Sequence, residues 1–380
     1  MTGLYIHIPF CKSRCIYCSF CSITQREMMS QYMKALKKEM YCRRNELPSG
    51  KQLTTIYIGG GTPSVLTPVM LAQVFKNIDT HFLGKKGWTS VQEITIECNP
   101  DDITQELAVL IKQLGVNRVS LGVQTFNNQR LRFLARRHND RQVIDAVRWL
   151  KQAGIDNISI DLIYGFPQQT EDDWAHDIRQ ALSLQVPHIS AYSLTYEEGT
   201  PLWRMRDTGK VKDIDEQQYR KLFYMLIDNL KDAGYEHYEI SNFALPGKQS
   251  RHNSSYWHDI PYIGIGAAAH SYDMKSRRWN TNDVKAYIAK TLTDNTPYET
   301  EIIDDNTHFN DLITTMLRTK KGLSLKKITE SFPQSFLNDL LNEAQPWIEQ
   351  KLLVTDNNHL HLTREALFIS DRIMSDLVRV

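Results

Sequence analysis

The sequence has almost no excess of charge of either sign and no long apolar run. Lys and Arg together number 45 and Asp and Glu 44, which leaves a formal net charge of +1. This balance gives no electrostatic support for a nucleic-acid partner or for direct binding to an anionic membrane. No stretch approaches the roughly 20 apolar residues that span a bilayer. The first residues, MTGLYIHIPFCKSRC, contain no basic segment leading into an apolar run, so we expect no secretion signal and a cytoplasmic location.

Cysteines are few and unevenly placed. Four of the six lie between Cys11 and Cys21, while Cys42 and Cys98 stand alone. Disulfide frameworks of secreted proteins spread their cysteines so that they join distant loops. Four cysteines in one short segment cannot do this well, so we expect metal binding or redox chemistry in a reducing compartment.

Short β-like runs alternate with amphipathic stretches through the first half of the chain. This alternation is typical of repeated βα units around a parallel sheet. The expected strands are Tyr5–Ile8, Thr55–Ile58, Glu93–Glu97, Arg118–Val123, Asn157–Leu162 and His188–Tyr192. The expected helices between them are Ser30–Asn45, Thr67–His81, Thr104–Leu114, Asp140–Gln152 and Thr170–Leu184. Both a barrel and a doubly wound open sheet have this pattern, and periodicity does not separate the two.

The pattern changes after about Tyr196. A helix is expected at Asp215–Ala233, followed by an aromatic and glycine-rich segment from Tyr235 to Tyr272. From about Thr307, two helices, a hairpin turning at Asn357–Asn358 and a final amphipathic helix are expected. Helices followed by a two-stranded wing indicate a small winged-helix-like domain. We therefore expect three parts, at residues 1–200, 201–300 and 301–380.

Cys11, Cys15 and Cys18 form a CxxxCxxC pattern directly after the first expected strand. Three thiolates on a short loop can converge on a metal centre, and thiolates suit both iron–sulfur clusters and zinc. A zinc site needs a fourth ligand to complete its tetrahedron, and Cys21 and His7 are the candidates. In an iron–sulfur cluster with only three thiolate ligands, one iron stays open to a small molecule.

The stretch YIHIPFCKSRCIYCSF, with the aromatic Tyr17 just before its third cysteine, resembles the cluster loop of the radical S-adenosylmethionine (radical SAM) superfamily. Within it, the chain resembles the group that contains HemN-type coproporphyrinogen dehydrogenases and HemW-type heme chaperones. The resemblance covers almost the whole chain. It implies an α/β fold, a partial (β/α)6 barrel with a smaller C-terminal α+β, winged-helix-like domain. It also implies a 4Fe–4S cluster on Cys11, Cys15 and Cys18, with S-adenosylmethionine beside it.

Glycines and polar residues stand at the ends of several expected strands. The second strand runs into Gly59-Gly60-Gly61-Thr62-Pro63-Ser64, where consecutive glycines allow a ligand close to the backbone. In a barrel, the carboxyl ends of the strands form the mouth where ligands bind. The resemblance implies contacts to S-adenosylmethionine from Tyr5, Gly60, Gly61, Thr62, Glu97, Gln124, Arg136, Asp161, Tyr192 and Thr195. Arg136 would suit the carboxylate of this cofactor and Asp161 a ribose hydroxyl, and no residue is assigned a catalytic role.

Two functions are compatible with the resemblance, a heme chaperone and an oxygen-independent coproporphyrinogen III dehydrogenase. Three features favour the chaperone. Only ten residues precede Cys11, whereas the dehydrogenases carry a longer N-terminal segment. The dehydrogenases also have a cysteine two residues after the third ligand, where this chain has Phe20, so Cys21 is expected to be a free thiol. Finally, Arg251–Trp257 reads RHNSSYW, which matches the HNxxYW motif of the chaperones.

The same motif suggests where heme binds. A histidine is a fitting heme ligand, and Tyr256 and Trp257 can pack on a porphyrin face. The resemblance therefore makes His252 the expected heme-binding residue, with His270 in YIGIGAAAHSY the next candidate. The implied partners are heme and heme-accepting client proteins, with no nucleic acid. Peripheral membrane contact through clients and a homodimer are left open.

Overall fold

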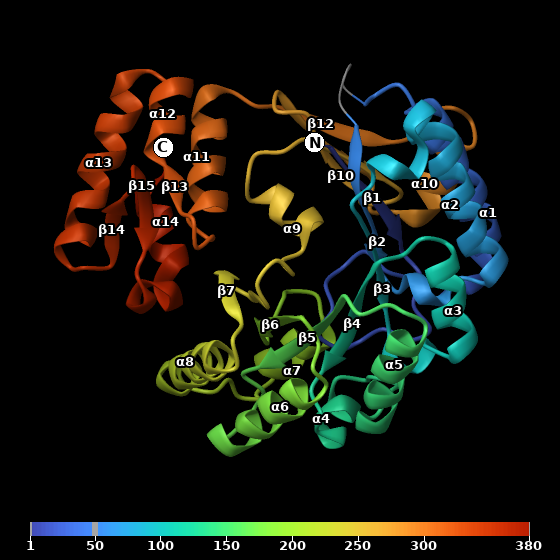
Figure 1. Cartoon of the computed structure of the whole chain (residues 1–380), viewed down its shortest axis with the longest axis horizontal. Helices are drawn as coiled ribbons and strands as arrows, with labels where there is room; N and C mark the ends of the chain where they lie inside the picture. The colour runs from blue at the N-terminus through green and yellow to red at the C-terminus, as the bar shows by residue number, and fades with distance from the viewer. Residues whose placement is uncertain (1, 48–51, 380) are drawn as a thin grey trace.

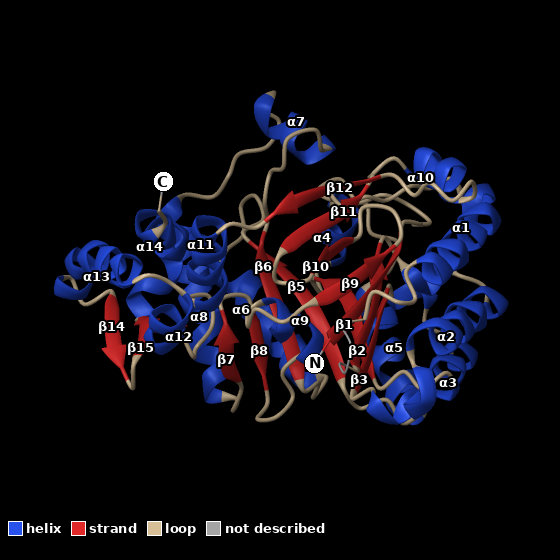
Figure 2. Cartoon of the chain, turned by 90° about the horizontal axis from the view of Figure 1, so that it is seen from above, coloured by secondary structure: helices blue, strands red, loops and turns tan. Residues whose placement is uncertain are grey.

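Parallel strands form the curved wall of a partial barrel at the centre of the molecule (Figure 2). The computed structural model describes residues 2–47 and 52–379. Neighbouring strands pair in parallel in chain order, without a reversal. A doubly wound sheet reverses its strand order at a switch point, so that alternative is excluded. The strands are β1 Thr2–Ile8, β2 Leu53–Gly60, β3 Glu93–Cys98, β4 Arg118–Gln124, β5 Ile158–Tyr164 and β6 His188–Ser193, which confirms those predicted from the sequence.

Helices between these strands cover the outside of the barrel wall (Figure 1). Their starts follow local capping signals: Thr67 accepts a hydrogen bond from the Met70 amide, and Thr170 forms a capping box with Asp173. The predicted helices are confirmed within a few residues at each end, and a short helix, α4, was not predicted. Their bounds are α1 Met29–Cys42, α2 Pro68–Phe82, α3 Gln105–Gln113, α4 Asn128–Phe133, α5 Asp140–Gln152 and α6 Glu171–Ser183.

Residues from 236 to 302 extend the barrel sheet at both ends, in a region where the sequence analysis predicted no strands. Beyond β6 lie the antiparallel strands β8 Asn242–Ala244 and β7 Glu236–Glu239. Beyond β1 lie β9 Tyr262–Ile265, β10 His270–Tyr272, β11 Ser276–Asn280 and β12 Tyr298–Ile302. The helices between β6 and β12 are α7 Pro201–Asp207, α8 Glu216–Asp232, α9 Arg251–Tyr256 and α10 Val284–Thr291, and α8 confirms the helix predicted at Asp215–Ala233.

The two faces of the barrel wall differ in the polarity of their side chains, as β4 shows. Val119, Leu121 and Val123 are buried in the apolar layer beneath the outer helices. The alternate residues of the same strand, Arg118, Ser120, Gly122 and Gln124, line a cavity inside the barrel. Successive side chains of a strand point to opposite faces, so the outward residues stabilise the fold and the inward polar residues are available to a ligand.

The C-terminal elements form a smaller α+β unit to one side of the barrel (Figure 1). They pack around an apolar cluster of their own, which runs from Phe309 to Leu377. The predicted hairpin between β14 and β15 is confirmed, because Asn357 and Asn358 both have positive φ, as a tight hairpin turn requires. The elements are α11 Asp305–Met316, β13 Leu323–Ser324, α12 Leu325–Ser331, α13 Gln334–Glu349, β14 Leu353–Asp356, β15 His359–Leu362 and α14 Ser370–Leu377. None of the helices in the described ranges combines the length and apolar composition needed to cross a bilayer.

A buried carboxylate, Glu39, fastens α1 to the added strands β9–β11. The Glu39 side chain is fully buried and pairs with the Arg43 guanidinium at 3.1 Å. Its oxygens also accept hydrogen bonds from the Gly266 amide at 2.9 Å, the Asn280 side chain at 2.7 Å and the Tyr287 hydroxyl at 2.6 Å. One carboxylate therefore satisfies four donors from separate segments of the chain.

Replacing Glu39 with alanine should destabilise the whole fold, because it leaves the buried Arg43 without this partner. We expect Glu39→Ala to lower the free energy of unfolding by about 3–5 kcal/mol, the usual cost of removing one member of a buried ion pair. Urea denaturation followed by circular dichroism measures this change. Glu27→Ala, at an exposed position in the turn before α1, is the control and should stay within about 0.5 kcal/mol of wild type. A Glu39→Ala protein as stable as the control would contradict the role of this carboxylate.

Candidate functional site

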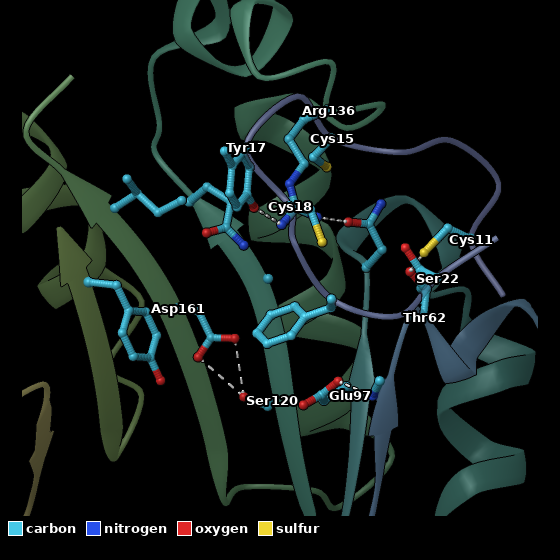
Figure 3. A pocket seen from close by; sticks show the side chains of 18 of the residues that line it. Cys11, Cys15, Tyr17, Cys18, Ser22, Thr62, Glu97, Ser120, Arg136 and Asp161 are labelled. Atoms are coloured by element: carbon cyan, nitrogen blue, oxygen red, sulfur yellow. Dashed lines mark hydrogen bonds between the residues drawn. The ribbon is translucent and has the colours of Figure 1, made fainter. Parts of the chain in front are cut away.

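A cavity of about 610 Å³ opens at the mouth of the barrel, between the loop after β1 and the carboxyl ends of β2–β6 (Figure 3). Most of the residues that line it have polar or thiol side chains. Of the residues predicted to bind the cluster or S-adenosylmethionine, it brings together Cys11, Cys15, Cys18, Gly60, Gly61, Thr62, Glu97, Gln124, Arg136, Asp161, Tyr192 and Thr195. Tyr5 and His252 do not line this cavity.

The loop that carries the three cysteines is closed at its base by backbone hydrogen bonds. The Cys11 amide donates to the Ile23 carbonyl at 2.9 Å, and the Ile23 amide donates to the Pro9 carbonyl at 2.7 Å. Cys11, Cys15 and Cys18 all line the upper part of the cavity, where Figure 3 shows their sulfur atoms. The short loop therefore presents three thiols to one space, as the CxxxCxxC spacing predicts.

Neither candidate for a fourth zinc ligand faces this space. The Cys21 thiol donates to the Asn282 carbonyl at 3.2 Å, and Cys21 is absent from the cavity lining. The His7 ring is occupied on both nitrogens, by the Tyr5 hydroxyl at 3.0 Å and the Cys21 carbonyl at 2.9 Å. Within residues 2–47 and 52–379, no three His, Cys, Asp or Glu side chains are arranged around a single metal ion. The arrangement therefore does not support the zinc alternative.

The three thiols fit an iron–sulfur cluster better than a single ion. In a 4Fe–4S cluster each thiolate binds a different iron, so the sulfurs need not meet at one point. Burial raises the pKa of the Cys11 and Cys18 thiols, so both are neutral in the free protein and lose a proton when they bind metal. Beside them, the Thr62 hydroxyl lies 3.4 Å from the Cys11 sulfur. The remainder of the cavity leaves room for a small molecule next to the three thiols.

The glycine turn after β2 is packed against the cluster loop and held by Glu97. A Cβ on Gly60 would lie 2.6 Å from the His7 ring, and one on Gly61 would lie 2.9 Å from the backbone of Phe10. These glycines are thus required by packing of the chain on itself, while the turn still lines the cavity. The Glu97 carboxylate accepts a hydrogen bond from the Gly60 amide at 3.0 Å.

Burial changes the pKa of the Glu97 carboxyl group. Its second oxygen accepts a hydrogen bond from the Tyr57 hydroxyl at 2.7 Å. Desolvation raises the pKa of Glu97 to about 7, and nearby Asp161 adds to the effect. Asp161 itself accepts hydrogen bonds from the Ser120 hydroxyl at 3.3 Å, below the sulfur atoms in Figure 3. The two carboxylates are placed to accept hydrogen bonds from hydroxyl or amino groups of a ligand in the cavity.

Arg136 supplies a positive charge beside the cysteines. Its guanidinium donates to the Asn99 side chain at 2.9 Å and to the Tyr17 hydroxyl at 2.7 Å. Although burial opposes its charge, Tyr17 and Cys15 raise the pKa of Arg136 above its usual value. Its buried Nε has no hydrogen-bond partner among the described residues. The guanidinium is therefore a cation held in a fixed position beside the three thiols.

The buried carboxylate of Asp102 joins three segments at the cavity mouth. It pairs with Lys12 of the cluster loop at 2.6 Å and with Arg137 at 3.2 Å. It also accepts a hydrogen bond from the hydroxyl of Ser64, in the turn after the glycines, at 2.8 Å. The sequence analysis did not identify this residue, because PDD after β3 looks like an ordinary turn. Asp102 fixes the cluster loop relative to the glycine turn.

His252 lies near the start of β1, away from the cysteines: a Cβ on Gly3 would lie 3.1 Å from its ring, and the ring centres of His252 and Tyr57 are 5.2 Å apart. The ring is 0% exposed, with Thr55 hydroxyl at 2.9 Å from Nδ1 and Tyr256 hydroxyl at 2.8 Å from Nε2. Burial lowers the pKa of His252 to about 3, so the ring is neutral. The prediction that His252 binds heme needs a histidine that heme can reach, and in this structure the ring is enclosed because α9 packs inside the barrel. Its neighbour Asn253 is the residue of the motif that reaches the cavity.

The other two predicted residues outside the cavity occupy different positions. Tyr5 lies on β1, hydrogen-bonded to His7 and packed beside Tyr57 with ring centres 6.1 Å apart. His270, the alternative heme-binding candidate, is exposed on β10 and stacks on Trp279 with ring centres 6.0 Å apart. His270 therefore has the accessibility that His252 lacks.

Comparisons with known proteins agree with this geometry. A family model described as the radical SAM superfamily matches residues 5–181, and one described as the HemN C-terminal domain matches residues 303–369. The heme chaperone HemW of Lactococcus lactis is 35% identical, over 97% of this chain and 95% of the relative. HemW of Bacillus subtilis is 32% identical, over 98% of both chains. Coproporphyrinogen III oxidase (HemN) from Escherichia coli, a radical SAM enzyme, shares the fold, with a TM-score of 0.85 at 22% identity over 99% of this chain and 90% of that one.

Removing the charge of Asp102 should loosen the cluster loop. In Asp102→Asn, the cations of Lys12 and Arg137 lose their shared carboxylate, and we expect a loss of about 1–3 kcal/mol in unfolding free energy. Amide hydrogen exchange of residues 10–24 should also accelerate, as followed by mass spectrometry. The exposed Asp79→Asn on α2 is the matched control and should leave both quantities unchanged. Unaltered exchange in the loop of Asp102→Asn would contradict this role.

Proposed function

Because the chain belongs to the radical SAM superfamily and, within it, to the HemW group of heme chaperones, we propose that it binds heme and delivers it to client proteins. The observation that carries this proposal is full-length similarity to relatives with that name, barrel and C-terminal unit included. The HNSSYW stretch and Phe20 after the third cysteine support the same choice. Delivery would take place in the cytoplasm, to client proteins that include some at the membrane surface. The protein would act alone or as a homodimer.

We further propose that the mouth cavity holds a 4Fe–4S cluster and S-adenosylmethionine. When bound, the cluster supplies an electron to S-adenosylmethionine through its open iron. Cys11, Cys15 and Cys18 would hold the cluster. Gly60 and Gly61 line the space beside the cluster, and the Thr62 hydroxyl lies next to the Cys11 sulfur.

The charged residues of the cavity then bind the two ends of S-adenosylmethionine. Arg136, which lines the cavity beside the cysteines, would supply the positive charge that attracts its carboxylate. Glu97 and Asp161 would accept hydrogen bonds from its amino and ribose hydroxyl groups. Gln124 at the end of β4, with Tyr192 and Thr195 after β6, would close the outer side. In this arrangement the chain orients the cofactor and excludes water from around the cluster.

Heme binding through His252 would require α9 to move. The helix would have to release the hydrogen bonds of the ring to Thr55 and Tyr256, and those from its own first amides to Glu93. His270 requires no such rearrangement, because it is already exposed beside Trp279. We propose His252 as the heme ligand because it lies in the HNxxYW motif, and His270 is the next residue to test.

The cluster proposal predicts which cysteines are needed for iron. Anaerobic reconstitution should yield about four irons per chain. Cys11→Ala, Cys15→Ala and Cys18→Ala should each lose the cluster, because each removes one of the three ligands. Cys21→Ala is the control and should keep it, since the Cys21 thiol points to Asn282. Iron content and the absorption spectrum measure both outcomes, and one zinc bound by all four cysteines would contradict the proposal.

The chaperone proposal predicts binding without turnover of the dehydrogenase substrate. The reconstituted protein should bind heme with a stoichiometry near one in an absorption titration. With reductant and S-adenosylmethionine it should not oxidise coproporphyrinogen III. Repeated turnover of coproporphyrinogen III would restore the dehydrogenase alternative.

Substitutions around α9 locate the heme ligand. His252→Ala should weaken heme binding by roughly tenfold or more, because the proposed axial ligand is lost. Tyr256→Phe is the control, because it removes the hydrogen-bond partner of the ring but keeps the ring. Equal heme affinity in His252→Ala and wild type would keep the chaperone function but move the site, and His270→Ala would then be measured.

A further inference from the structure

The short helix α9, which carries His252, is held at its two ends by different parts of the molecule. At its start, the amides of Arg251 and His252 donate to the Glu93 carboxylate of β3, both at 2.9 Å. In Figure 1 the helix lies between the barrel strands and the C-terminal unit. The residues that follow it, 257–259, contact that unit, so the position of α9 depends on both parts of the chain.

Asp259, three residues after the end of α9, joins this segment to the C-terminal unit. Its side chain is 3% exposed, and one carboxylate oxygen accepts a hydrogen bond from the Lys327 ammonium of α12 at 2.6 Å. The same oxygen lies 3.1 Å from Nε2 of His308 on α11. The other oxygen accepts a hydrogen bond from the Tyr272 hydroxyl of β10. One carboxylate therefore connects the segment after α9 with two helices of the C-terminal unit and with the barrel sheet.

A second contact holds Trp257, the residue directly after α9. The Arg318 guanidinium lies over the Trp257 ring, 5.0 Å from the ring centre, as in a cation–π contact. Arg318 follows α11, and it also pairs with Glu239 of β7 at 3.5 Å. Its carbonyl accepts a hydrogen bond from the Ile240 amide at 3.1 Å. Arg318 thus lies against both the end of α9 and the edge of the barrel sheet.

The contacts of Asp259 and Trp257 with the C-terminal unit are electrostatic, whereas each unit has an apolar cluster of its own. Polar interfaces between domains usually permit relative motion. When both partners of an ion pair separate, both charges return to water, which offsets much of the lost attraction. The C-terminal unit can therefore move away from residues 257–259 without disrupting either apolar cluster.

We propose that the contacts of Asp259 and Trp257 form a clamp through which the C-terminal unit closes the heme site, and that opening of this clamp lets α9 move and exposes His252. This inference rests on the proposed heme-chaperone function with His252 as the ligand. In the closed state the ring is 0% exposed, and its nitrogens are engaged by the Thr55 and Tyr256 hydroxyls. Heme iron can bind the ring only where one of these hydrogen bonds is broken. Each clamp contact lowers the population of the open state in which this happens.

The population of the open state then controls two separate measurements. Amides of α9 exchange their hydrogen through local opening, at a rate proportional to the population of the open state. The apparent affinity for heme is proportional to the same population while that population is small. A substitution that weakens the clamp should therefore increase the exchange rate of residues 251–257 and the affinity for heme by the same factor.

Two variants of the reconstituted full-length protein test this inference. Asp259→Asn removes the charge and keeps a residue type that tolerates the left-handed backbone at this position, where φ is 58°. Lys327→Met removes the ammonium of a partly exposed side chain and keeps its aliphatic part, so it tests the clamp even if Asp259→Asn does not fold. In each variant, hydrogen exchange of residues 251–257, followed by mass spectrometry, should accelerate roughly tenfold or more. An absorption titration with hemin should show tighter binding by the same factor.

Lys326→Met is the matched control, because Lys326 is the neighbouring residue on α12 and pairs with Glu330 of the same helix. It should exchange and bind hemin as wild type does. The gain in affinity must also depend on the buried ring, so His252→Ala added to Lys327→Met should remove it.

The outcomes separate the clamp from the chaperone function. Unchanged exchange of residues 251–257 in Lys327→Met overturns the clamp, whatever the hemin titration gives. Faster exchange without tighter hemin binding, or a gain in affinity that persists after His252→Ala, overturns its control of the heme site and leaves the chaperone function in place. If neither wild type nor any variant binds hemin, the chaperone function is overturned and this inference with it.

Discussion

The shared carboxylate of Asp102 is the constraint on which the geometry of the cavity mouth depends. Lys12, Ser64 and Arg137 come from three loops that have no secondary structure in common, and each is held by this one buried side chain. Loops have little intrinsic preference for a single conformation, and a buried ionic hub restricts them strongly. The hub therefore fixes the three thiols of the cluster loop relative to the glycine turn and to the cation of the neighbouring Arg136.

In the barrel beneath the mouth, residues that stabilise the fold alternate along each strand with residues that face the cavity. Outward-facing residues of β4, such as Leu121, are fully buried under helices. Inward-facing residues such as Ser120 and Arg118 line the cavity, where their polar groups can contact a ligand. Among the arginine side chains that line the cavity, Arg136 lies at the mouth beside the cysteines, and Arg118 lies at the first position of β4.

Much of the barrel and of the cavity mouth could be predicted from the sequence, because local signals determine them. Thr67 and Thr170 begin their helices through side-chain caps, and the CxxxCxxC spacing alone brings three thiols to one loop. Strands β9–β12 could not be predicted, because they are short and stabilised by pairing with β1 and with one another. The burial of His252 could not be predicted from the sequence either. It depends on Glu93, which is distant in the sequence and accepts hydrogen bonds from the first amides of α9. The inward-facing residues of β4 had a signal in the alternation of polar and apolar residues along RVSLGVQ, which places Arg118 and Ser120 on one face of the strand.

We propose that one cavity holds a three-thiolate cluster with an open iron next to a bound S-adenosylmethionine. Low-temperature electron paramagnetic resonance of the reduced, reconstituted protein tests it most directly, because the signal of the cluster reports the ligands of its irons. We expect a 4Fe–4S signal whose g values shift when S-adenosylmethionine is added. The same signal with and without saturating S-adenosylmethionine, in a protein with full iron content, would contradict it.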